Sequence, residues 1–269
     1  MKGKVIIVTG ASSGIGLALT EQLAKEGACI IMAARNYEKL KEIADDFSSK
    51  YECNLLPVKT DVSIEDDCKN LIDKTIEKYG KIDVLINNAG LSMRALFKDV
   101  DLKVIRQLMD VNFYGTVYCT KFALPYLVNT KGSIVGVTSI AGFHGLPGRT
   151  GYSASKFAMH GFLETIRIEN LKNGLHVMIA APSFTASNVR KSALTADGTP
   201  QGDTPRDENK MMSAEEVAKA IIKGIKKRKR NIILSWQGML TVLMQRITPH
   251  RLDKIFYNML AKEPNSPFK

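Results

Sequence analysis

The fold is decided by the stretch KVIIVTGASSGIG at residues 4–16. Its first part, Lys4 to Val8, is rich in β-branched residues, which favour a strand. Three glycines follow among small residues, and Leu17 to Lys25 then repeats its apolar residues with the period of a helix. The stretch therefore predicts a strand, a glycine turn and a helix, in that order.

Gly10, Gly14 and Gly16 have the spacing Gly-x3-Gly-x-Gly. Glycine lets a backbone approach a pyrophosphate closely, and a helix N-terminus offers free N–H groups and the positive end of its dipole. The spacing differs from the Gly-x-Gly-x-x-Gly of other dinucleotide folds and from a phosphate loop that ends in Gly-Lys-Ser/Thr. Many strand-to-helix turns use glycine only for tight packing, so the turn alone leaves nucleotide binding open.

Short apolar runs alternate with helical patterns along the rest of the chain. This alternation predicts an α/β fold, with a mostly parallel sheet and helices on both faces. The expected strands are Val5 to Val8, Cys29 to Ala33, Asn54 to Lys59, Val84 to Asn87, Ser133 to Ser139, Leu175 to Ala181 and, as a candidate seventh, Asn231 to Ser235. With 269 residues, 45% of them hydrophobic, the chain can bury one sizeable core. We therefore expect a single domain over residues 1–269.

Tyr152 and Lys156 form a pair suited to acid and base chemistry. At positions i and i+4 of an expected helix, a phenol and an ammonium point into the same space. A free phenol has a pKa of about 10, and lowering it by about three units needs roughly 4 kcal/mol from nearby positive charge. Taken alone, the pair is better explained by an amphipathic helix with a solvated lysine.

The cysteines and histidines show no metal-binding pattern. Without a Cys-x-x-Cys motif, reduced core thiols are expected and a metal site is not. These residues are Cys29, Cys53, Cys68, Cys119, His144, His160, His176 and His250. The chain begins directly with the first expected strand, so no signal peptide is expected, and no apolar run reaches the length of a membrane span.

Several further motifs follow the glycine turn in a fixed order. They are Asp61-Val62, Asn87-Asn88-Ala89-Gly90, Asn112, Ser139, Tyr152 with Lys156, and Pro182. Together with Thr9 to Gly16, the series resembles the compact single-domain type of the short-chain dehydrogenase/reductase (SDR) family over almost all of residues 3–235. The resemblance implies a doubly wound, Rossmann-type sheet of about seven strands. Glycine spacing and chain length argue against the extended type, and so against a sugar-nucleotide epimerase.

The resemblance also implies a role for each motif. The cofactor contacts would come from Gly10, Ser12, Ser13, Gly14, Ile15 and Gly16, from Asp61 and Val62 at the adenine, and from Asn88, Ala89 and Gly90 beside the ribose. Asn112, in an expected helix from Asp110 to Leu127, would hold a water in a proton relay to Lys156. Ser139 would hydrogen-bond the substrate carbonyl, and Lys156 would hold the nicotinamide ribose. Tyr152 would donate a proton to the carbonyl oxygen as hydride arrives, or remove it from the alcohol in reverse. Asn88 and Asn112 could instead be structural amides.

Arg35 indicates which nicotinamide cofactor is used. It follows the second expected strand, where an NAD site would place an acid on the ribose 2′-hydroxyl. An arginine can pair with a 2′-phosphate and stack on adenine. Ser12 and Ser13 occupy the place of a further basic residue in the glycine loop, and Arg35 could merely lie in solvent. We expect NADP(H) rather than NAD(H).

The segment after the sixth expected strand departs from the family pattern. The family usually has Pro-Gly, whereas this chain has Pro182-Ser183, and Thr185 and Ser187 remain as hydroxyls for the nicotinamide carboxamide. Residues 196–210 are polar and lack apolar periodicity. Long polar loops inside compact domains are usually functional or disordered. A substrate lid is therefore expected near 183–212.

The C-terminal part is strongly basic. Residues 211–269 contain twelve Lys or Arg against four Asp or Glu, within a chain of net charge +11, and Lys226 to Arg230 is the densest cluster. The extension 236–269 is amphipathic, so peripheral contact with an anionic membrane is one option. Helices near the substrate cleft or at a subunit contact are the simpler explanation. No recognition motif for nucleic acid accompanies the charge, so no nucleic-acid partner is expected.

These features together predict an SDR-type carbonyl reductase or alcohol dehydrogenase that uses NADP(H) to interconvert a ketone and a secondary alcohol. The apolar C-terminal region suggests a hydrophobic substrate. We expect a cytoplasmic homodimer or homotetramer. The alternative is a nucleotide-sensing or membrane-docked interaction protein that kept the fold without turnover, and the presence of Asn112, Ser139, Tyr152 and Lys156 argues against it.

Overall fold

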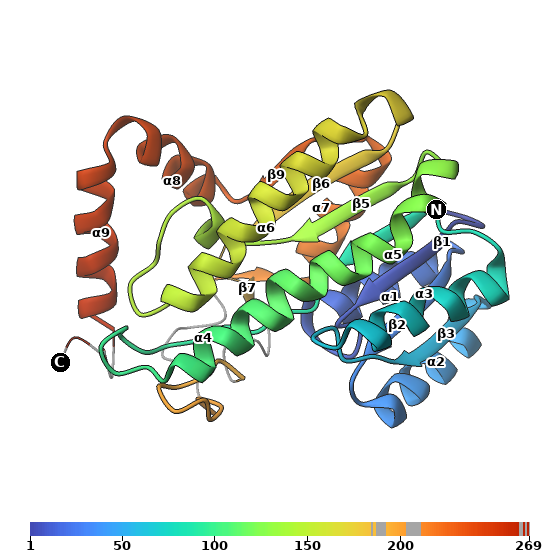
Figure 1. Cartoon of the computed structure of the whole chain (residues 1–269), viewed down its shortest axis with the longest axis horizontal. Helices are drawn as coiled ribbons and strands as arrows, with labels where there is room; N and C mark the ends of the chain where they lie inside the picture. Colours follow the sequence, from blue (N-terminus) through green and yellow to red (C-terminus); the bar gives the residue numbers. More distant parts are fainter. Residues whose placement is uncertain (184, 187–191, 203–210, 264–265, 267, 269) are drawn as a thin grey trace.

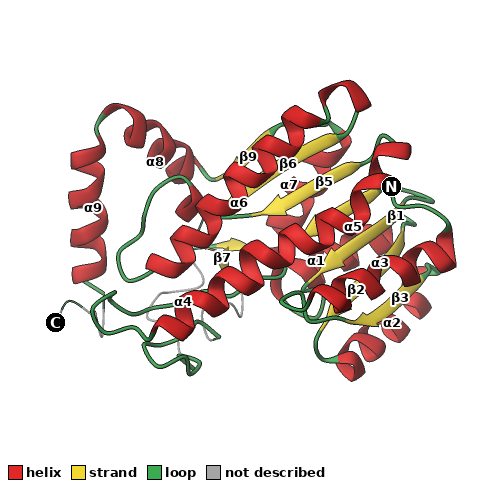
Figure 2. Cartoon of the chain, viewed as in Figure 1, coloured by secondary structure: helices red, strands yellow, loops and turns green. Residues whose placement is uncertain are grey.

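A computed structural model describes residues 1–183, 185–186, 192–202, 211–263, 266 and 268 of the chain. Seven parallel strands form a sheet in the order β3-β2-β1-β4-β5-β6-β9 (Figures 1 and 2). These strands are β1 (Val5–Thr9), β2 (Cys29–Ala34), β3 (Leu55–Lys59), β4 (Val84–Asn87), β5 (Ser133–Val137), β6 (His176–Pro182) and β9 (Asn231–Leu234). The order reverses beside β1, which confirms the predicted doubly wound, Rossmann-type sheet.

The described helices are α1 (Gly14–Lys25), α2 (Tyr37–Tyr51), α3 (Glu65–Tyr79), α4 (Leu102–Leu108), α5 (Gly115–Asn129), α6 (Thr150–Glu169), α7 (Ala214–Lys226), α8 (Trp236–Ile247) and α9 (Pro249–Ala261). Helices α1, α2 and α7 cover one face of the sheet, and α3, α5 and α6 cover the other. No helix in the described ranges is both long and apolar enough to cross a bilayer.

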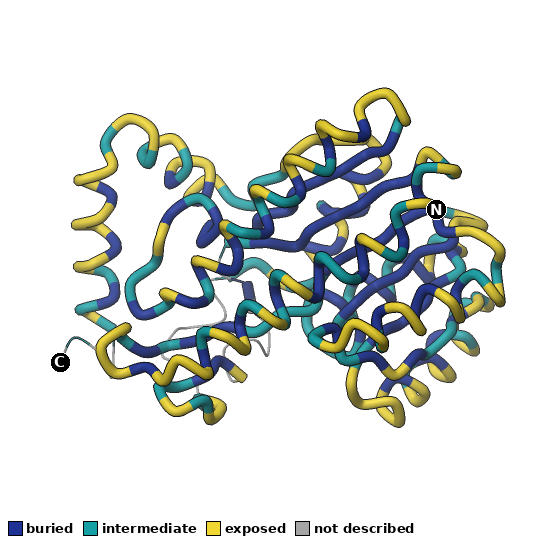
Figure 3. The backbone as a smooth tube through the Cα atoms, in the orientation of Figure 1, coloured by how far each residue is buried: buried dark blue, intermediate teal, exposed yellow. Residues whose placement is uncertain are grey.

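Strand side chains alternate between two packing layers. On β1, Ile6 and Val8 pack with residues of α1, α2 and α7, whereas Val5 and Ile7 pack with residues of α3, α5 and α6. Both sets are buried, and Figure 3 shows the strands dark beneath helices whose outer sides are exposed. Burial on both faces explains why these strands are almost continuously apolar in sequence.

The predicted strands all exist, with ends displaced by no more than two residues. The predicted start of a helix at Asp110 is wrong. Helical structure begins at Leu102 in α4, continues through a π-helical turn at Met109–Tyr114 and runs on as α5 to Asn129. The first part was missed because Val104 and Leu108 pack in a small separate cluster, away from the periodic face that meets the sheet.

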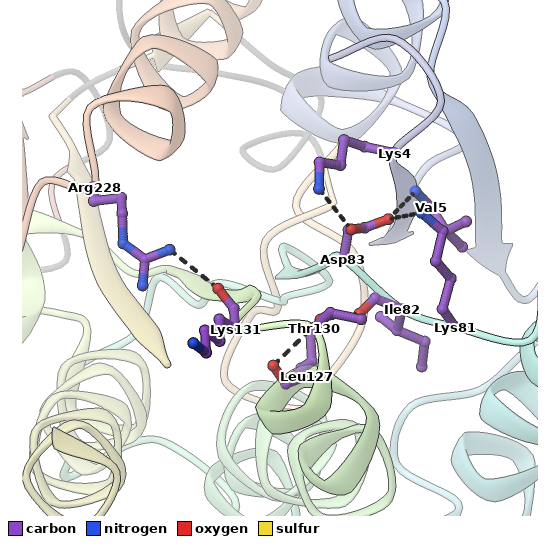
Figure 4. A network of polar contacts seen from close by, with 9 residues as sticks. All are labelled: Lys4, Val5, Lys81, Ile82, Asp83, Leu127, Thr130, Lys131 and Arg228. Carbon is purple, nitrogen blue, oxygen red and sulfur yellow. Dashed lines mark hydrogen bonds and ion pairs between the residues drawn. The ribbon is translucent and has the colours of Figure 1, made fainter. Parts of the chain in front are cut away.

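A buried carboxylate holds the amino-terminal edge of the sheet. Asp83 accepts a hydrogen bond from the Val5 amide at 2.9 Å and pairs with Lys4 at 2.8 Å and with Lys81 at 3.0 Å (Figure 4). Burial alone would raise the pKa of Asp83, but the bonds from Lys4, Val5 and Lys81 outweigh it and hold that pKa below its ordinary value. The amino-terminal ends of the strands therefore have a structural role. A ligand site is expected at the opposite, carboxyl ends.

The basic cluster Lys226 to Arg230 lies at the same amino-terminal ends of the strands. Arg228 donates to the Lys131 carbonyl at 3.1 Å, just before β5 (Figure 4). Lys226 pairs with Glu26 at 2.6 Å. The strand β9 separates this cluster from α8, which lies with α9 at the opposite edge of the sheet (Figure 1). The cluster and the amphipathic helices therefore lie apart, whereas the membrane-binding option considered from the sequence placed them together.

Candidate active site

The glycine turn holds the start of α1 against the end of β4. Gly10 (φ 67°) and Gly14 (φ 53°) are left-handed, a conformation that favours glycine. A Cβ on Gly10 would come within 2.9 Å of the Ala89 backbone, and one on Gly16 would overlap the Gly10 carbonyl. Asn88 Nδ2 donates to the Thr9 carbonyl at 2.8 Å, so the structural role considered for this amide is present.

The helix α1 begins without a side-chain cap. Ser13, at the N-cap, makes no capping hydrogen bond, and the first turn contains no acidic residue. The first amides of a helix have no intrahelical partner, and the helix dipole favours an anion beside them. The turn therefore fits the pyrophosphate of a dinucleotide.

A cleft of about 560 Å³ extends from this turn across the carboxyl ends of the strands. Most predicted site residues line it: Gly10, Ser12, Ser13, Gly14, Ile15, Arg35, Asp61, Val62, Asn88, Ala89, Gly90, Ser139, Tyr152, Lys156, Pro182 and Thr185. Gly16 and Asn112 are not among the lining residues. Gly16 acts through close packing of the turn, and Asn112 is buried behind the wall.

Ser139, Tyr152 and Lys156 meet on one side of the cleft. Ser139 follows β5, while Tyr152 and Lys156 lie one turn apart on α6. The Ser139 hydroxyl is near enough to the Tyr152 phenol to lower the pKa of that phenol. Lys156 Nζ lies 5.7 Å from the centroid of the Tyr152 ring and donates to the Val137 carbonyl at 3.1 Å. An ammonium and two hydroxyls thus converge where a polar group of a ligand could bind.

Burial shifts the proton affinity of both α6 side chains. Burial lowers the pKa of Lys156 to about 8. Burial raises the pKa of Tyr152, and the nearby Ser139 hydroxyl and the Arg149 charge offset this only in part. The predicted lowering of the phenol pKa needs Lys156 together with the positive ring of an oxidised nicotinamide, so it stays a prediction for the cofactor-bound protein. Tyr152 is therefore a protonated phenol at neutral pH, the form that can donate a proton.

Asn112 braces two parts of the site. Its Nδ2 donates to Ser155 Oγ at 2.8 Å and to the Leu91 carbonyl at 3.0 Å, while its Oδ1 accepts from the Leu91 amide at 2.8 Å. A Cβ on Gly90 would come within 3.1 Å of Asn112 Oδ1 and 3.5 Å of Lys156 Nζ. Asn112 is thus a neighbour of Lys156 across Gly90, with a side chain already engaged in structural bonds.

The end of the cleft beside β2 carries two cations. Arg35 follows β2, and Lys39, which the sequence argument missed, lies four residues later on the first turn of α2. Asn36 caps α2 by accepting from the Lys39 amide at 3.1 Å. Arg35 lies before the N-cap of α2, so no helical spacing relates it to Lys39, and only the fold brings the two cations to the same end of the cleft.

Arg149 and Ser92 are further lining residues that the sequence argument missed. Arg149 Nη1 donates to Ser92 Oγ at 2.6 Å and to the Met93 carbonyl at 3.0 Å. Arg149 precedes Tyr152 by three residues at the start of α6, a spacing that places two side chains on one face. Its position in the sequence therefore contained a usable signal, whereas Ser92 is brought in only by the fold.

The segment after β6 is described in part. Thr185 lines the cleft and donates to the Ser183 carbonyl at 3.2 Å, and Ser183 Oγ lies 2.6 Å from Ser235 Oγ. Ser187, Asn188 and much of the predicted lid, residues 187–191 and 203–210, lie outside the described residues. The strands β7 (Thr185–Ala186) and β8 (Met212–Ser213) pair at the two ends of this segment. Between them, the Leu194 amide donates to the Ser92 carbonyl at 2.8 Å, beside the cleft.

A family model for short chain dehydrogenases matches residues 4–198. The chain belongs to the short-chain dehydrogenase family. The predicted SDR membership is thus confirmed, and the protein is an oxidoreductase of that family with the family's nucleotide-binding fold.

Similar proteins are known from plants. An 11-beta-hydroxysteroid dehydrogenase A from Sesamum indicum is 32% identical over 273 residues, which cover 99% of this chain and 78% of that protein. An 11-beta-hydroxysteroid dehydrogenase-like protein 4A from Arabidopsis thaliana is 38% identical over 226 residues, covering 84% and 74%.

Two solved structures share the fold at lower identity. A short chain dehydrogenase/reductase from Burkholderia phymatum in complex with NAD superposes with a TM-score of 0.82 at 22% identity, covering 93% of this chain and 95% of that one. An alcohol dehydrogenase from Thermococcus sibiricus complexed with 5-hydroxy-NADP gives 0.76 at 24% identity, covering 87% and 96%.

Proposed function

We propose that the protein is an NADP(H)-dependent oxidoreductase that interconverts a ketone and a secondary alcohol. The observation that carries this proposal is the meeting of the Ser139 and Tyr152 hydroxyls with Lys156 in a cleft that also reaches the uncapped N-terminus of α1. A bound nicotinamide cofactor would supply the hydride for reduction, or accept it in the reverse direction.

The two hydroxyls would act on the oxygen of the substrate. Ser139 would hydrogen-bond the carbonyl oxygen, and Tyr152, whose raised pKa keeps it protonated, would donate its proton to that oxygen. Lys156, charged below its pKa of about 8, would hold the ribose hydroxyls of the cofactor. Asn112 would hold the water of a proton relay to Lys156, in addition to bracing Leu91 and Ser155.

The proposed preference for NADP(H) rests on Arg35 and Lys39. Both line the end of the cleft beside β2, where the two positive charges suit a 2′-phosphate. The two solved structures are named with an NAD and an NADP-type ligand respectively, so the choice depends on these side chains and not on the fold.

A hydrophobic ketone is the proposed substrate class. The plant relatives are named for hydroxysteroids, which have a large apolar body. On this chain, Leu91, Val111, Ile140 and Leu146 give the substrate side of the cleft apolar walls.

We also propose a homodimer or homotetramer. Tyr114 and Phe157 are 43% and 46% exposed on the outer sides of the π-helical turn and α6. The Tyr114 ring stacks on that of Tyr118 with centroids 6.0 Å apart. Large exposed aromatic side chains of this kind are typical of protein interfaces.

Peripheral contact with an anionic membrane is a second candidate function, and α8 favours it. Five exposed apolar side chains recur with helical spacing along one stripe of this helix: Trp236, Met239, Leu240, Leu243 and Ile247. Replacing Leu243 and Ile247 by Gln should weaken binding to anionic vesicles, whereas replacing Lys226 to Arg230 by Gln should change it less, because that cluster lies at the other edge of the sheet. Wild-type protein that ignores such vesicles at low salt would reject this candidate.

The proposed oxidoreductase activity is tested by measuring NADPH consumption across a panel of ketones and aldehydes. We expect turnover with apolar ketones and a lower rate with NADH. Binding of NADPH without consumption of any carbonyl compound would favour a nucleotide-sensing protein instead.

A further inference from the structure

His160 is a half-buried histidine that has no part in the reaction proposed above. It lies one helical turn beyond Lys156 on α6, and Lys156 in turn lies one turn beyond Tyr152. Residues four apart share one face of a helix. His160 therefore extends the face of α6 that carries the proposed proton donor and its neighbouring lysine.

This face of α6 meets successive residues at the end of β5. Lys156 Nζ donates to the Val137 carbonyl at 3.1 Å, and His160 Nε2 lies 2.9 Å from Thr138 Oγ1. The next residue along the chain is Ser139, which would hold the oxygen of the substrate. His160 is thus bonded to the residue directly before that serine.

The His160 ring donates the bond to Thr138. The Thr138 hydroxyl directs its own hydrogen at the Ala180 carbonyl, 3.2 Å away, so Oγ1 accepts from the imidazole. Burial, together with the charges of Lys156 and Arg167, lowers the pKa of His160 to about 4. The imidazole is therefore neutral at physiological pH, and it anchors Thr138 without placing a second positive charge beside Lys156.

His160 also packs against the turn that follows Ser139. A Cβ on Gly142 would come within 2.7 Å of His160 Nε2, and the Phe143 ring lies edge-on to the imidazole with centroids 4.4 Å apart. Within this turn, Ser139 Oγ accepts a hydrogen bond from the Ala141 amide at 3.2 Å. His160 therefore contacts the chain on both sides of the serine.

We propose that His160 is a positioning residue, which holds the Ser139 hydroxyl where it can bond the oxygen of the substrate. It would act through the serine, because His160 lies outside the described lining of the cleft, whereas Thr138 and Ser139 belong to that lining. The inference rests on the proposed function and adds to it how the serine is held. A small displacement of a group that contacts the reacting atoms can lower a rate by orders of magnitude.

Replacing His160 by Leu tests this role, because it removes the hydrogen bond and keeps an apolar side chain. At saturating NADPH, kcat and kcat/KM for an apolar ketone should both fall by roughly tenfold to a hundredfold, since a misplaced serine weakens binding of the transition state. The Kd for NADPH should stay unchanged. His160→Gln keeps an N–H donor on a side chain of similar reach, so it should restore most of the rate.

His176 provides the matched control at the opposite end of β5. Its Nδ1 lies 3.0 Å from Ser133 Oγ, and its Nε2 lies 2.9 Å from the Lys229 carbonyl. His176→Leu should lower the melting temperature, because buried polar groups lose their partner, but it should leave kcat unchanged. Equal falls of kcat in His160→Leu and His176→Leu would overturn the positioning role.

A double substitution tests whether His160 acts through Ser139. In a Ser139→Ala protein, His160→Leu should cause no further fall of kcat, because the group that His160 positions is already gone. The same fall in both backgrounds would overturn the positioning role. Where His160→Leu fails to fold, Thr138→Val removes the acceptor of the same bond and should lower kcat by a similar factor.

The outcomes also separate this role from the proposed function. Wild-type kcat in His160→Leu or in Thr138→Val would overturn the positioning role, while reduction of the ketone by the wild-type protein would still support the oxidoreductase. A wild-type protein that reduces no ketone would overturn both.

Discussion

The two ends of the cleft are held by different kinds of contact. Around Gly10 and Gly14, backbone shape and close packing against Ala89 hold the turn, and all of this lies within a strand–turn–helix unit and its paired strand. At the substrate end, side chains far apart in the chain hold the wall, as in the Arg94–Glu263 and His144–Gln245 contacts. Changes at one end should therefore affect nucleotide binding, and changes at the other should affect substrate binding.

The largest expected effect comes from Tyr152→Phe, at the boundary between the two ends. The change removes the hydroxyl that would donate the proton, so turnover should fall about a thousandfold, within the usual range for general acid catalysis. The affinity for NADPH, measured by fluorescence titration, should stay nearly unchanged because the ring remains. Turnover close to that of the wild type would show that another group donates the proton.

Glu263→Gln tests the long-range contacts of the substrate end. The change removes one charged contact of Arg94, whose side chain is only 12% exposed, and the free energy of unfolding should fall by about 2 kcal/mol, the usual contribution of a hydrogen bond between charged groups. KM for ketones should rise while the Kd for NADPH stays constant.

The control is Lys98→Gln, which breaks a pair at 2.8 Å between side chains that are 74% and 48% exposed. An exposed pair contributes about 0–1 kcal/mol, so the variant should resemble the wild type. Equal effects of the two variants would contradict the assignment of Glu263 to the substrate wall.

Arg35→Asp tests the nucleotide end. An acid there would repel a 2′-phosphate and accept a hydrogen bond from a 2′-hydroxyl. The ratio of kcat/KM for NADPH to that for NADH should fall by a factor of roughly 10 to 100, the range expected for one charge-assisted bond. Lys39→Gln should shift the ratio in the same direction by less. An unchanged ratio in Arg35→Asp would show that Arg35 lies in solvent without contacting the cofactor.

The smallest expected effect on stability comes from Lys156→Met, which should stabilise the protein but abolish its activity. Removal of this buried charge should stabilise the cofactor-free protein at neutral pH by an amount on the order of 1 kcal/mol, while activity is lost. The pH dependence follows from the pKa of about 8, which lies below the ordinary 10.5.

Below pH 8, Lys156 is charged in both the folded and the unfolded protein. Between about 8 and 10.5, only the unfolded protein keeps the proton, so wild-type stability rises with pH and the advantage of the variant shrinks. Thermal unfolding measured across this window checks the sign. If the extra stability of Lys156→Met over the wild type grew above pH 8, burial of the charged Lys156 would not be what destabilises the wild-type protein.

Sequence reasoning works best where neighbours along the chain determine the structure. The strands were predicted because their apolar runs are buried on both faces, and the glycine turn because its spacing reflects backbone contacts. Arg149 had a usable spacing signal from Tyr152, whereas Lys39 had none, because Arg35 lies before the start of α2. Leu146 and Ser92 had none, because the fold alone brings them to the cleft.

The C-terminal region shows the opposite case. Its composition marked Lys226 to Arg230 as the notable feature, whereas the structure has Arg228 bonded to the Lys131 carbonyl at the amino-terminal ends of the strands. The packing of α8 and α9 against the loop before α6 depends on His144, whose contacts with Gln245 and Phe256 span more than a hundred residues and leave no local pattern.

The most direct test of the proposed reaction is transfer of deuterium from labelled NADPH to an apolar ketone. The account predicts that the wild-type protein forms an alcohol carrying the label on its carbinol carbon, because hydride moves directly between cofactor and substrate within one cleft. NADPH binding with no labelled alcohol from any apolar ketone would contradict the account.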